Sequence, residues 1–180
     1  MAIMAKKKSA AYYYAGGKRV ALETATDLVA VDDARLAAQL PDLLASDDAL
    51  QAGQSLRGGI RLIHTKALAA GTFDALKRTG VTQPVFRQDG TILIALPEIR
   101  VEDESEAKLD KVRKFAANQV EPIAEGAEGR MTLQPLSAKG EDAMHLANTL
   151  IEQYELTSAT PRFLRIVPNP DVAPQPTRHG

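Results

Sequence analysis

Thr160-Pro-Arg-Phe-Leu-Arg-Ile-Val-Pro-Asn-Pro170 is the stretch that decides how the fold ends. Its side chains alternate between the two faces of a predicted strand in the order Phe163, Leu164, Arg165, Ile166 and Val167. Pro168 and Pro170 then remove two backbone N–H donors, so the strand cannot continue through them. The sequence therefore predicts a closing strand, followed by a flexible C-terminal tail over residues 169–180.

Composition and charge set the broad class of the protein. The 180 residues are 44% hydrophobic, which is enough for one large domain or two small ones. A net charge of -1 gives no basic surface for a nucleic acid, and no window is long and apolar enough for a membrane helix. We expect a soluble cytoplasmic protein with a disordered N-terminus over residues 1–11, and neither nucleic acid nor membrane as a partner.

The first half alternates strands and helices. Tyr12-Tyr-Tyr14 and residues 19–22 flank a Gly16-Gly17 turn, which predicts a hairpin. Residues 27–31 form a strand, and leucines at helical spacing follow it, with Pro41 expected to split the helix. The remaining elements are a loop over residues 46–54, a strand over 60–62, a helix capped by Thr72 and ended by Gly80, and a strand over 81–87.

The second half has a similar order of elements. Strands are expected over residues 91–96 and 98–102, and Asp103 with Glu106 resembles a capping box at the start of a helix. A loop over residues 124–129 leads to a strand over 131–133. A helix over residues 141–154, with Ala143, Ala147, Leu150 and Tyr154 on one face, precedes the closing strand.

The two halves read as an internal repeat of about 70 to 77 residues. The order strand, helix, strand, strand, helix, strand in each half indicates an α+β fold of two tandem ferredoxin-like (βαββαβ) sandwiches, with antiparallel sheets and helices on one face. We predict one repeat over residues 12–88 and the other over residues 89–168. The uncovered faces either cover each other or leave at least one face available to a partner.

Catalytic and cofactor motifs are absent from the sequence. The three histidines, His64, His145 and His179, share no metal-ligand spacing, and no serine lies in a nucleophile elbow. No glycine-rich loop ends in Gly-Lys-Ser or Gly-Lys-Thr, and the predicted central strands carry no aromatic residues for stacking RNA bases. We expect a protein that is not an enzyme and that holds neither a metal nor a cofactor.

Several short motifs together resemble a known family. They are Tyr12-Tyr-Tyr-Ala-Gly-Gly-Lys18, Leu28-Val-Ala-Val31, Pro84-Val-Phe-Arg-Gln-Asp-Gly90, Asp142-Ala-Met-His-Leu-Ala-Asn-Thr-Leu150 and Pro161-Arg-Phe-Leu-Arg165. This pattern, from about residue 12 to residue 169, resembles the N-terminal region of bacterial subtilisin-like serine proteases. In those proteins it precedes the catalytic domain, and its second half is similar to the propeptide that inhibits subtilisins.

The resemblance implies a protease-binding surface. Such a propeptide packs its open sheet face on two surface helices of the protease, places acidic groups near their N-termini and lays its C-terminal extension in the substrate cleft. By position, the cleft-binding residues would be Phe163, Leu164, Arg165, Ile166, Val167, Pro168 and Asn169, and the capping acids would be Glu125 and Glu128. The chain would be part of a zymogen or a stand-alone inhibitor. The alternative is a non-enzymatic ligand-binding or scaffolding protein with a pocket between its repeats.

Overall fold

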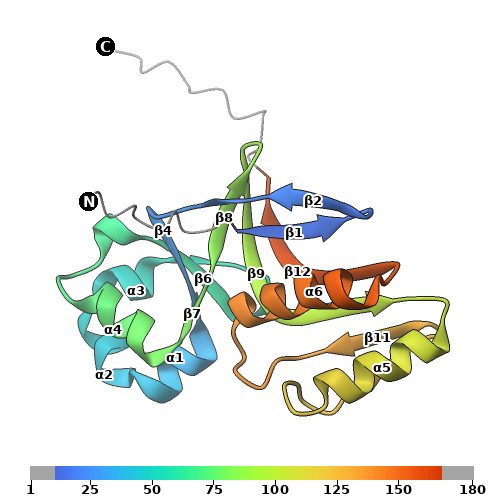
Figure 1. The fold of residues 1–180 in the computed structure, drawn as a ribbon. Coiled ribbons are helices and arrows are strands. Elements are labelled where there is room, and N and C mark those ends of the chain that lie inside the picture. The colour runs from blue at the N-terminus through green and yellow to red at the C-terminus, as the bar shows by residue number, and fades with distance from the viewer. Residues whose placement is uncertain (1–10, 168–180) are drawn as a thin grey trace, which may run out of the picture.

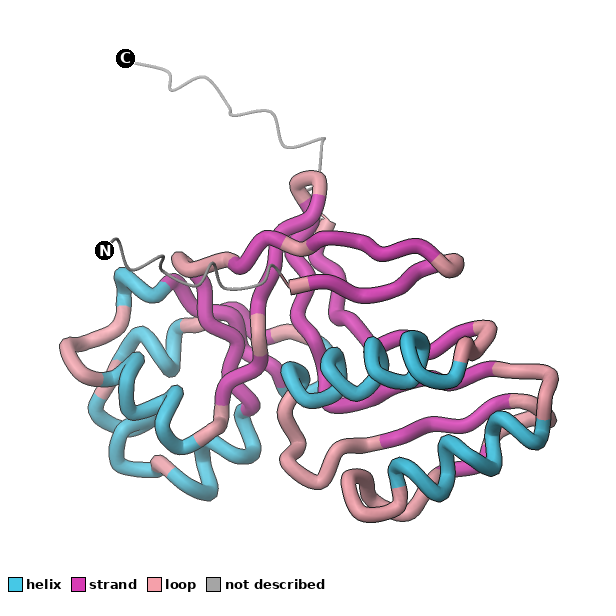
Figure 2. The backbone as a smooth tube through the Cα atoms, in the orientation of Figure 1, coloured by secondary structure: helices cyan, strands magenta, loops and turns pink. Residues whose placement is uncertain are grey.

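The computed structural model describes residues 11–167 and is a mixed α/β fold with antiparallel sheets (Figures 1 and 2). Residues 1–10 and 168–180 lie outside the described residues, and with them most of the predicted disordered N-terminus and the whole predicted tail. Ala11 is described, and its carbonyl accepts a hydrogen bond from the N–H of Leu22 at 2.8 Å.

The first half builds a four-stranded sheet. Its strands are β4 (Leu28–Asp32), β5 (Gln54–Ser55), β6 (Ile60–His64) and β7 (Thr82–Gln83). Its helices are α1 (Asp33–Gln39), α2 (Pro41–Ser46), α3 (Asp48–Ala52) and α4 (Thr72–Thr79), with short 3-10 turns at Arg57–Gly59 and Thr65–Ala67. The strands lie in the order β5-β6-β4-β7, and all the pairs are antiparallel.

The second half repeats this order of strands. It consists of β9 (Thr91–Glu102), α5 (Glu106–Ala116), β10 (Ala124–Glu125), β11 (Arg130–Leu133), α6 (Gly140–Tyr154) and β12 (Ser158–Ile166). The strands lie in the order β10-β11-β9-β12. When the strands of each half are numbered in chain order, both sheets have the strand order 2-3-1-4.

Short strands join the halves. β8 (Val85–Gln88) pairs with β9 on one side and with β3 (Glu23–Thr24) on the other. β1 (Tyr12–Ala15) and β2 (Lys18–Ala21) form the predicted hairpin, which packs on the sheet beside α6 (Figure 1). The amino-terminal part of β9 thus lies between β8 and β12, and its carboxyl-terminal part lies between β11 and β12.

Three predictions for the first half are wrong. The single strand expected over residues 81–87 is two strands, because β7 pairs with β4 in the first sheet and β8 pairs with β9 in the second. The expected loop over residues 46–54 contains α3, because the Asp47 carboxylate accepts from the N–H of Ala49 at 3.0 Å and Leu50 is fully buried. Gly71, at φ +80°, occupies the N-cap position predicted for Thr72. The Thr72 hydroxyl instead donates to Asp47 at 2.8 Å. The predicted split at Pro41 is confirmed.

Three predictions for the second half also need correction. The loop expected over residues 124–129 begins with β10, which pairs with β11. The expected strands over residues 91–96 and 98–102 are one strand, β9, because β12 shifts its register between Pro161 and Phe163 beside Pro97. The missing N–H of Pro97 therefore interrupts no regular ladder. At the start of α5 the N-cap is Ser105, whose hydroxyl accepts from Lys108 N–H, and not Asp103.

Four apolar clusters hold these elements together. Residues of α5 and α6 pack on one face of the second sheet, around Ile99, Val101 and Leu133. The helices of the first half pack on β4 and β6 around Val29, Val31 and Ile63. The third cluster lies between the halves, and the fourth lies under the hairpin, where the ring of Tyr13 meets Phe163 edge-on at 4.9 Å.

A buried polar contact fixes α6 against the first half. The side chain of Gln83 is 3% exposed; its Oε1 accepts from the N–H of Gly140 at 2.7 Å and its Nε2 donates to Ala138 O at 3.0 Å. Gly140 lies so close to β9 that a Cβ at this position would be 2.0 Å from Ala95 O. Only glycine fits there, since the obstacle is backbone.

Replacing Gly140 with alanine is expected to destabilise the protein by about 1–3 kcal/mol or more, because α6 must move away from β9. Gly126→Ala is the matched control, since its added Cβ would meet its nearest atom at an ordinary 3.5 Å. Urea unfolding of the two variants measures both effects. Equal stability of the two variants would contradict the close contact between Gly140 and Ala95.

Candidate functional site

The second sheet has one face without helices, which we call the open face. Strand alternation sends Ile99 and Val101 of β9 toward α5 and α6, so their neighbours point the other way. Beside Ala124 of β10, the open face carries eight side chains from β9, β11 and β12: Glu98, Arg100, Glu102, Arg130, Thr132, Ser158, Thr160 and Arg162. These side chains are exposed or half-buried. All eight are polar.

The corresponding face of the first sheet is covered. Leu28, Ala30, Ile60 and Leu62 point away from the helices of the first half and pack against Ile94 of β9 and Val85 of β8. Leu164 and Ile166 of β12 also pack on this cluster. Among residues 11–167, nothing covers the open face of the second half in this way, so this is the sheet face that these residues leave available.

Alternating charges organise the open face. Arg162 donates to Glu98 at 3.1 Å, and the guanidinium of Arg130 lies 3.4 Å from Glu102. Arg100 lies 3.8 Å from Glu98. These are surface ion pairs, each worth at most about 1 kcal/mol in water. They arrange the charges and contribute little to stability.

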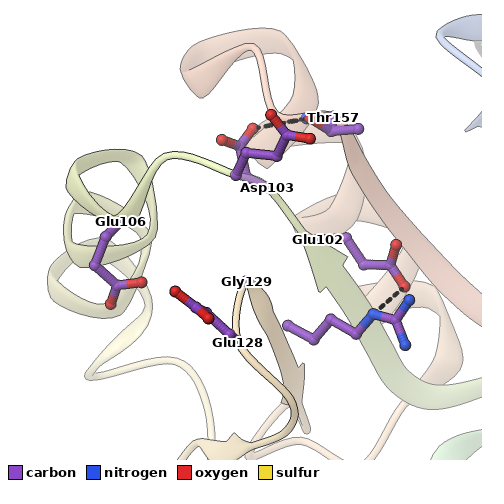
Figure 3. Close-up of a pocket in the computed structure, with 8 residues that line it drawn as sticks. Glu102, Asp103, Glu106, Glu128, Gly129 and Thr157 are labelled. Atoms are coloured by element: carbon purple, nitrogen blue, oxygen red, sulfur yellow. Dashed lines mark hydrogen bonds and ion pairs between the residues drawn. The ribbon is translucent and has the colours of Figure 1, made fainter.

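An acidic cavity of about 600 Å³ lies at one end of this face, where β9 ends and α5 begins (Figure 3). Its rim carries the carboxylates of Glu102, Glu104, Glu106 and Glu128. The carboxylates of Glu106 and Glu128 point toward each other in Figure 3. Arg130 is the one cation among the cavity's lining residues. The cavity therefore favours positive charge.

Asp103 connects the elements at this end of the sheet through buried hydrogen bonds. It is 7% exposed and accepts from the N–H groups of Ser105 at 2.7 Å and Thr157 at 2.9 Å. Burial alone would raise the pKa of Asp103, but the hydrogen bonds from these two N–H groups outweigh it and hold the pKa below its ordinary value. The carboxylate thus ties the start of α5 to the residue before β12.

The two predicted capping acids lie in different surroundings. Arg113 Nε donates to Glu125 Oε1 at 2.9 Å and Arg113 Nη2 donates to Glu125 Oε2 at 3.1 Å. This paired hydrogen bond lowers the pKa of Glu125, and Arg113 also binds Glu106 and Asp110. Glu128 is exposed, and within residues 11–167 its carboxylate has no hydrogen bond or ion pair. Glu128 is the acid that can reach a partner.

The structure places Phe163, Leu164, Arg165 and Ile166 inside β12, each opposite a residue of β9. Phe163, Leu164 and Ile166 pack on apolar clusters, whereas Arg165 is exposed. Val167 follows the strand and is 70% exposed. The other two predicted cleft residues, Pro168 and Asn169, lie outside the described residues.

A second groove, of about 570 Å³, runs between the halves. Its walls include Ile60 and Gln83 of the first half and Leu96, Pro97 and Leu136 of the second. Leu136 is 56% exposed, which is unusual for a large apolar residue. Charged residues also line the groove, namely Asp32, Arg57, Glu98, Glu121 and Arg162, so its walls are mixed. A concave site between two packed units is a common place for a ligand.

The part of the chain that the structure describes contains neither a group of metal-ligand side chains nor a helix that could cross a membrane. No group of three or more His, Asp or Glu side chains there could hold a metal ion. His64 ends β6 and His145 lies on α6, so they belong to different elements. Across residues 11–167, no helix has the length and apolar character needed to cross a membrane.

Comparison with known proteins gave no match: no family model, no curated protein and no solved structure matches the chain significantly. The function therefore has to be inferred from the surfaces described above.

The sequence predicted that a sheet face could stay uncovered, but it did not assign the residues on that face or the structural role of Asp103. The alternation in Glu98-Ile-Arg-Val-Glu102 carried the signal for the first, because acidic and basic side chains fall on one face of a strand and apolar ones on the other. The local pattern predicts a helix cap at Asp103, whereas its carboxylate accepts from the N–H of Thr157, 54 positions away. No local pattern encodes that contact.

Asp103→Asn is expected to destabilise the protein by about 1–3 kcal/mol at pH 7, because a buried charge-assisted hydrogen-bond set is lost. The folded-state pKa of Asp103 is lowered, so its stabilisation is present above the ordinary pKa of about 3.9 and is lost as the pH falls below it. Unfolding free energies measured from pH 7 to pH 2 should show the gap between the wild type and the variant shrinking below about pH 4. A gap that does not depend on pH would contradict the lowered pKa, and Glu104→Gln, at an exposed neighbour, serves as the control.

Proposed function

We propose that this chain is the prodomain of a subtilisin-like serine protease, or a stand-alone inhibitor of one, and is not itself an enzyme. The single observation that carries the proposal is the open face of the second half: a polar sheet face, bordered by acidic residues, that no part of residues 11–167 covers. The motifs from Tyr12 to Arg165 that resemble the N-terminal region of such proteases point to the same partner.

We further propose that the fold is a tandem pair of ferredoxin-like sandwiches. The order of elements supports this, since β4, the α1–α3 segment, β5, β6, α4 and β7 correspond to β9, α5, β10, β11, α6 and β12. Both halves thus have the βαββαβ order and the same order of strands in the sheet. The prosequences that the chain resembles use the open face of such a sandwich to hold the protease.

In this proposal the open face lies on two surface helices of the protease. Glu128, with Glu104 beside it, would face the positive N-terminal ends of those helices, whereas Glu106 is paired with Arg113 at 2.7 Å. Each such carboxylate contributes about 0.3–1 kcal/mol, so most of the affinity must come from other contacts. Glu125 is held by Arg113 and has the smaller role.

The residues that follow β12 would supply those other contacts. Phe163 to Ile166 are held in the sheet by β9, so in this proposal they aim the chain and do not enter the cleft. Val167, Pro168 and Asn169 would extend into the substrate cleft and pair with its strands through main-chain hydrogen bonds.

Inhibition kinetics test the proposal. The purified chain should inhibit a subtilisin-like protease encoded in its own genome, and a chain ending at Ile166 should inhibit at least about tenfold less well, a loss of about 1.4 kcal/mol of binding free energy. A chain lacking residues 1–10 is the control for loss of a terminal segment, and in this proposal it should inhibit like the full chain. Absence of inhibition by the full chain across all such proteases would refute the proposal.

The groove between the halves favours one rival function, a non-enzymatic ligand-binding or scaffolding protein. The groove has a volume of about 570 Å³, and its walls mix apolar residues, including the exposed Leu136, with charged ones such as Glu98 and Arg162, which suits a small amphipathic ligand or a partner's side chain. In that case removal of residues 167–180 should leave binding unchanged, and Leu136→Glu should abolish it.

A further inference from the structure

Arg100 occupies the centre of the open face. The β-sheet register places Thr132 of β11 directly opposite it on one side and Thr160 of β12 on the other. Both neighbours are short, so they do not shield its guanidinium group. The side chain of Arg100 is 65% exposed.

The donors of Arg100 are free within the described part of the chain. Its guanidinium makes no hydrogen bond to any residue from 11 to 167, and its nearest carboxylate oxygen, on Glu98, lies 3.8 Å away. Glu98 is already bonded to Arg162 at 3.1 Å. A planar fork of N–H donors therefore stands unused in the middle of a polar surface.

A hollow of about 260 Å³ lies beside this group. Arg100, Glu102, Arg130 and Thr132 line it from the sheet, and the loop residues Gly126 and Ala127 close one side. Glu102 is already paired with Arg130, so two arginines and one acid leave the lining with an excess of one positive charge. The side chain of Arg130 is 64% exposed and lies 3.4 Å from Glu102. Two arginine side chains thus border a space large enough for a short acidic side chain.

The charge balance of the open face points the same way. Three arginines, Arg100, Arg130 and Arg162, stand against two acids, Glu98 and Glu102, which leaves an excess of one positive charge. One further carboxylate would balance the face. Arginine binds a carboxylate through two parallel N–H donors, and such pairs gain strength when docking excludes water.

We propose that this hollow receives an aspartate or glutamate side chain from the docked protease, held by Arg100 through a bidentate pair and by Arg130 from the side. The proposal rests on the function proposed above and names the chemistry of the partner surface. The open face would then recognise the protease through complementary charges at two places. Its acidic end faces helix N-termini, and its centre accepts a carboxylate.

Inhibition constants for Arg100→Ala, Arg100→Lys and the control Arg78→Ala test this assignment. Arg78 is an exposed residue of α4, away from the open face. Arg100→Ala should raise the inhibition constant at least about tenfold, the loss of one buried charge pair, and Arg100→Lys should fall between it and the wild type. Raising the salt concentration should weaken inhibition by the wild type more than inhibition by Arg100→Ala. The melting temperatures of the wild type and the variants should be equal, which shows that the substitutions do not act through folding.

The outcomes separate this proposal from the function on which it rests. Inhibition by Arg100→Ala within about twofold of Arg78→Ala would overturn the carboxylate site while leaving the inhibitor function in place. Inhibition by neither the wild type nor the Arg78→Ala control would overturn both. Rescue of Arg100→Glu by a lysine in place of one acidic residue on the protease would identify the partner group.

Discussion

Backbone pairing of β9 is the constraint on which the rest of the structure depends. Its amino-terminal residues pair with β8 and β12, and its carboxyl-terminal residues pair with β11 and β12. Its side chains enter three of the four apolar clusters: Ile94 between the halves, Leu93 and Ala95 under the hairpin, and Ile99 and Val101 under α5 and α6. Each fully buried leucine, isoleucine or valine contributes about 1.5–3 kcal/mol, so this strand joins the halves energetically as well as geometrically.

The position of β9 explains why one face of the first sheet is covered while the corresponding face of the second sheet is open. The amino-terminal part of β9, with β8 and β12, covers the apolar face of the first sheet. The carboxyl-terminal part extends beyond that contact, and there the outward side chains change from Ile92, Ile94 and Leu96 to Glu98, Arg100 and Glu102. The change from apolar to charged residues occurs at Pro97, where the groove between the halves also lies. The same strand thus builds a buried interface and an exposed binding surface.

Much of the fold could be predicted from local patterns. The Gly16-Gly17 hairpin, the helix break at Pro41, the strand around Leu133 and the long helix α6 depend on periodicity and turn chemistry over a few residues, and all are present. The similar order of elements predicted for the two halves agrees with the common strand order of the two sheets, in which β6 with Ile60 and Leu62 and β11 with Met131 and Leu133 hold the same place.

The features that the sequence did not reveal depend on distant partners. Helix α3 is held by Asp47, whose carboxylate binds Thr72 25 residues away. The continuity of β9 through Pro97 depends on the register shift in β12. Which open face stays exposed depends on how the halves pack, so the charges around Arg100 could be listed from the sequence but not assigned to a free surface.

Native-state hydrogen exchange of the β9 amides tests the shared strand most directly. If β9 joins the halves into one cooperative unit, the amides of Leu93, Ile94, Ala95, Ile99 and Val101 exchange only through global unfolding and give one common free energy. A lower opening free energy for Leu93 to Ala95, with Ile99 and Val101 still protected, would show that the halves unfold separately. That result would contradict the claim that β9 joins the two halves into one cooperative unit.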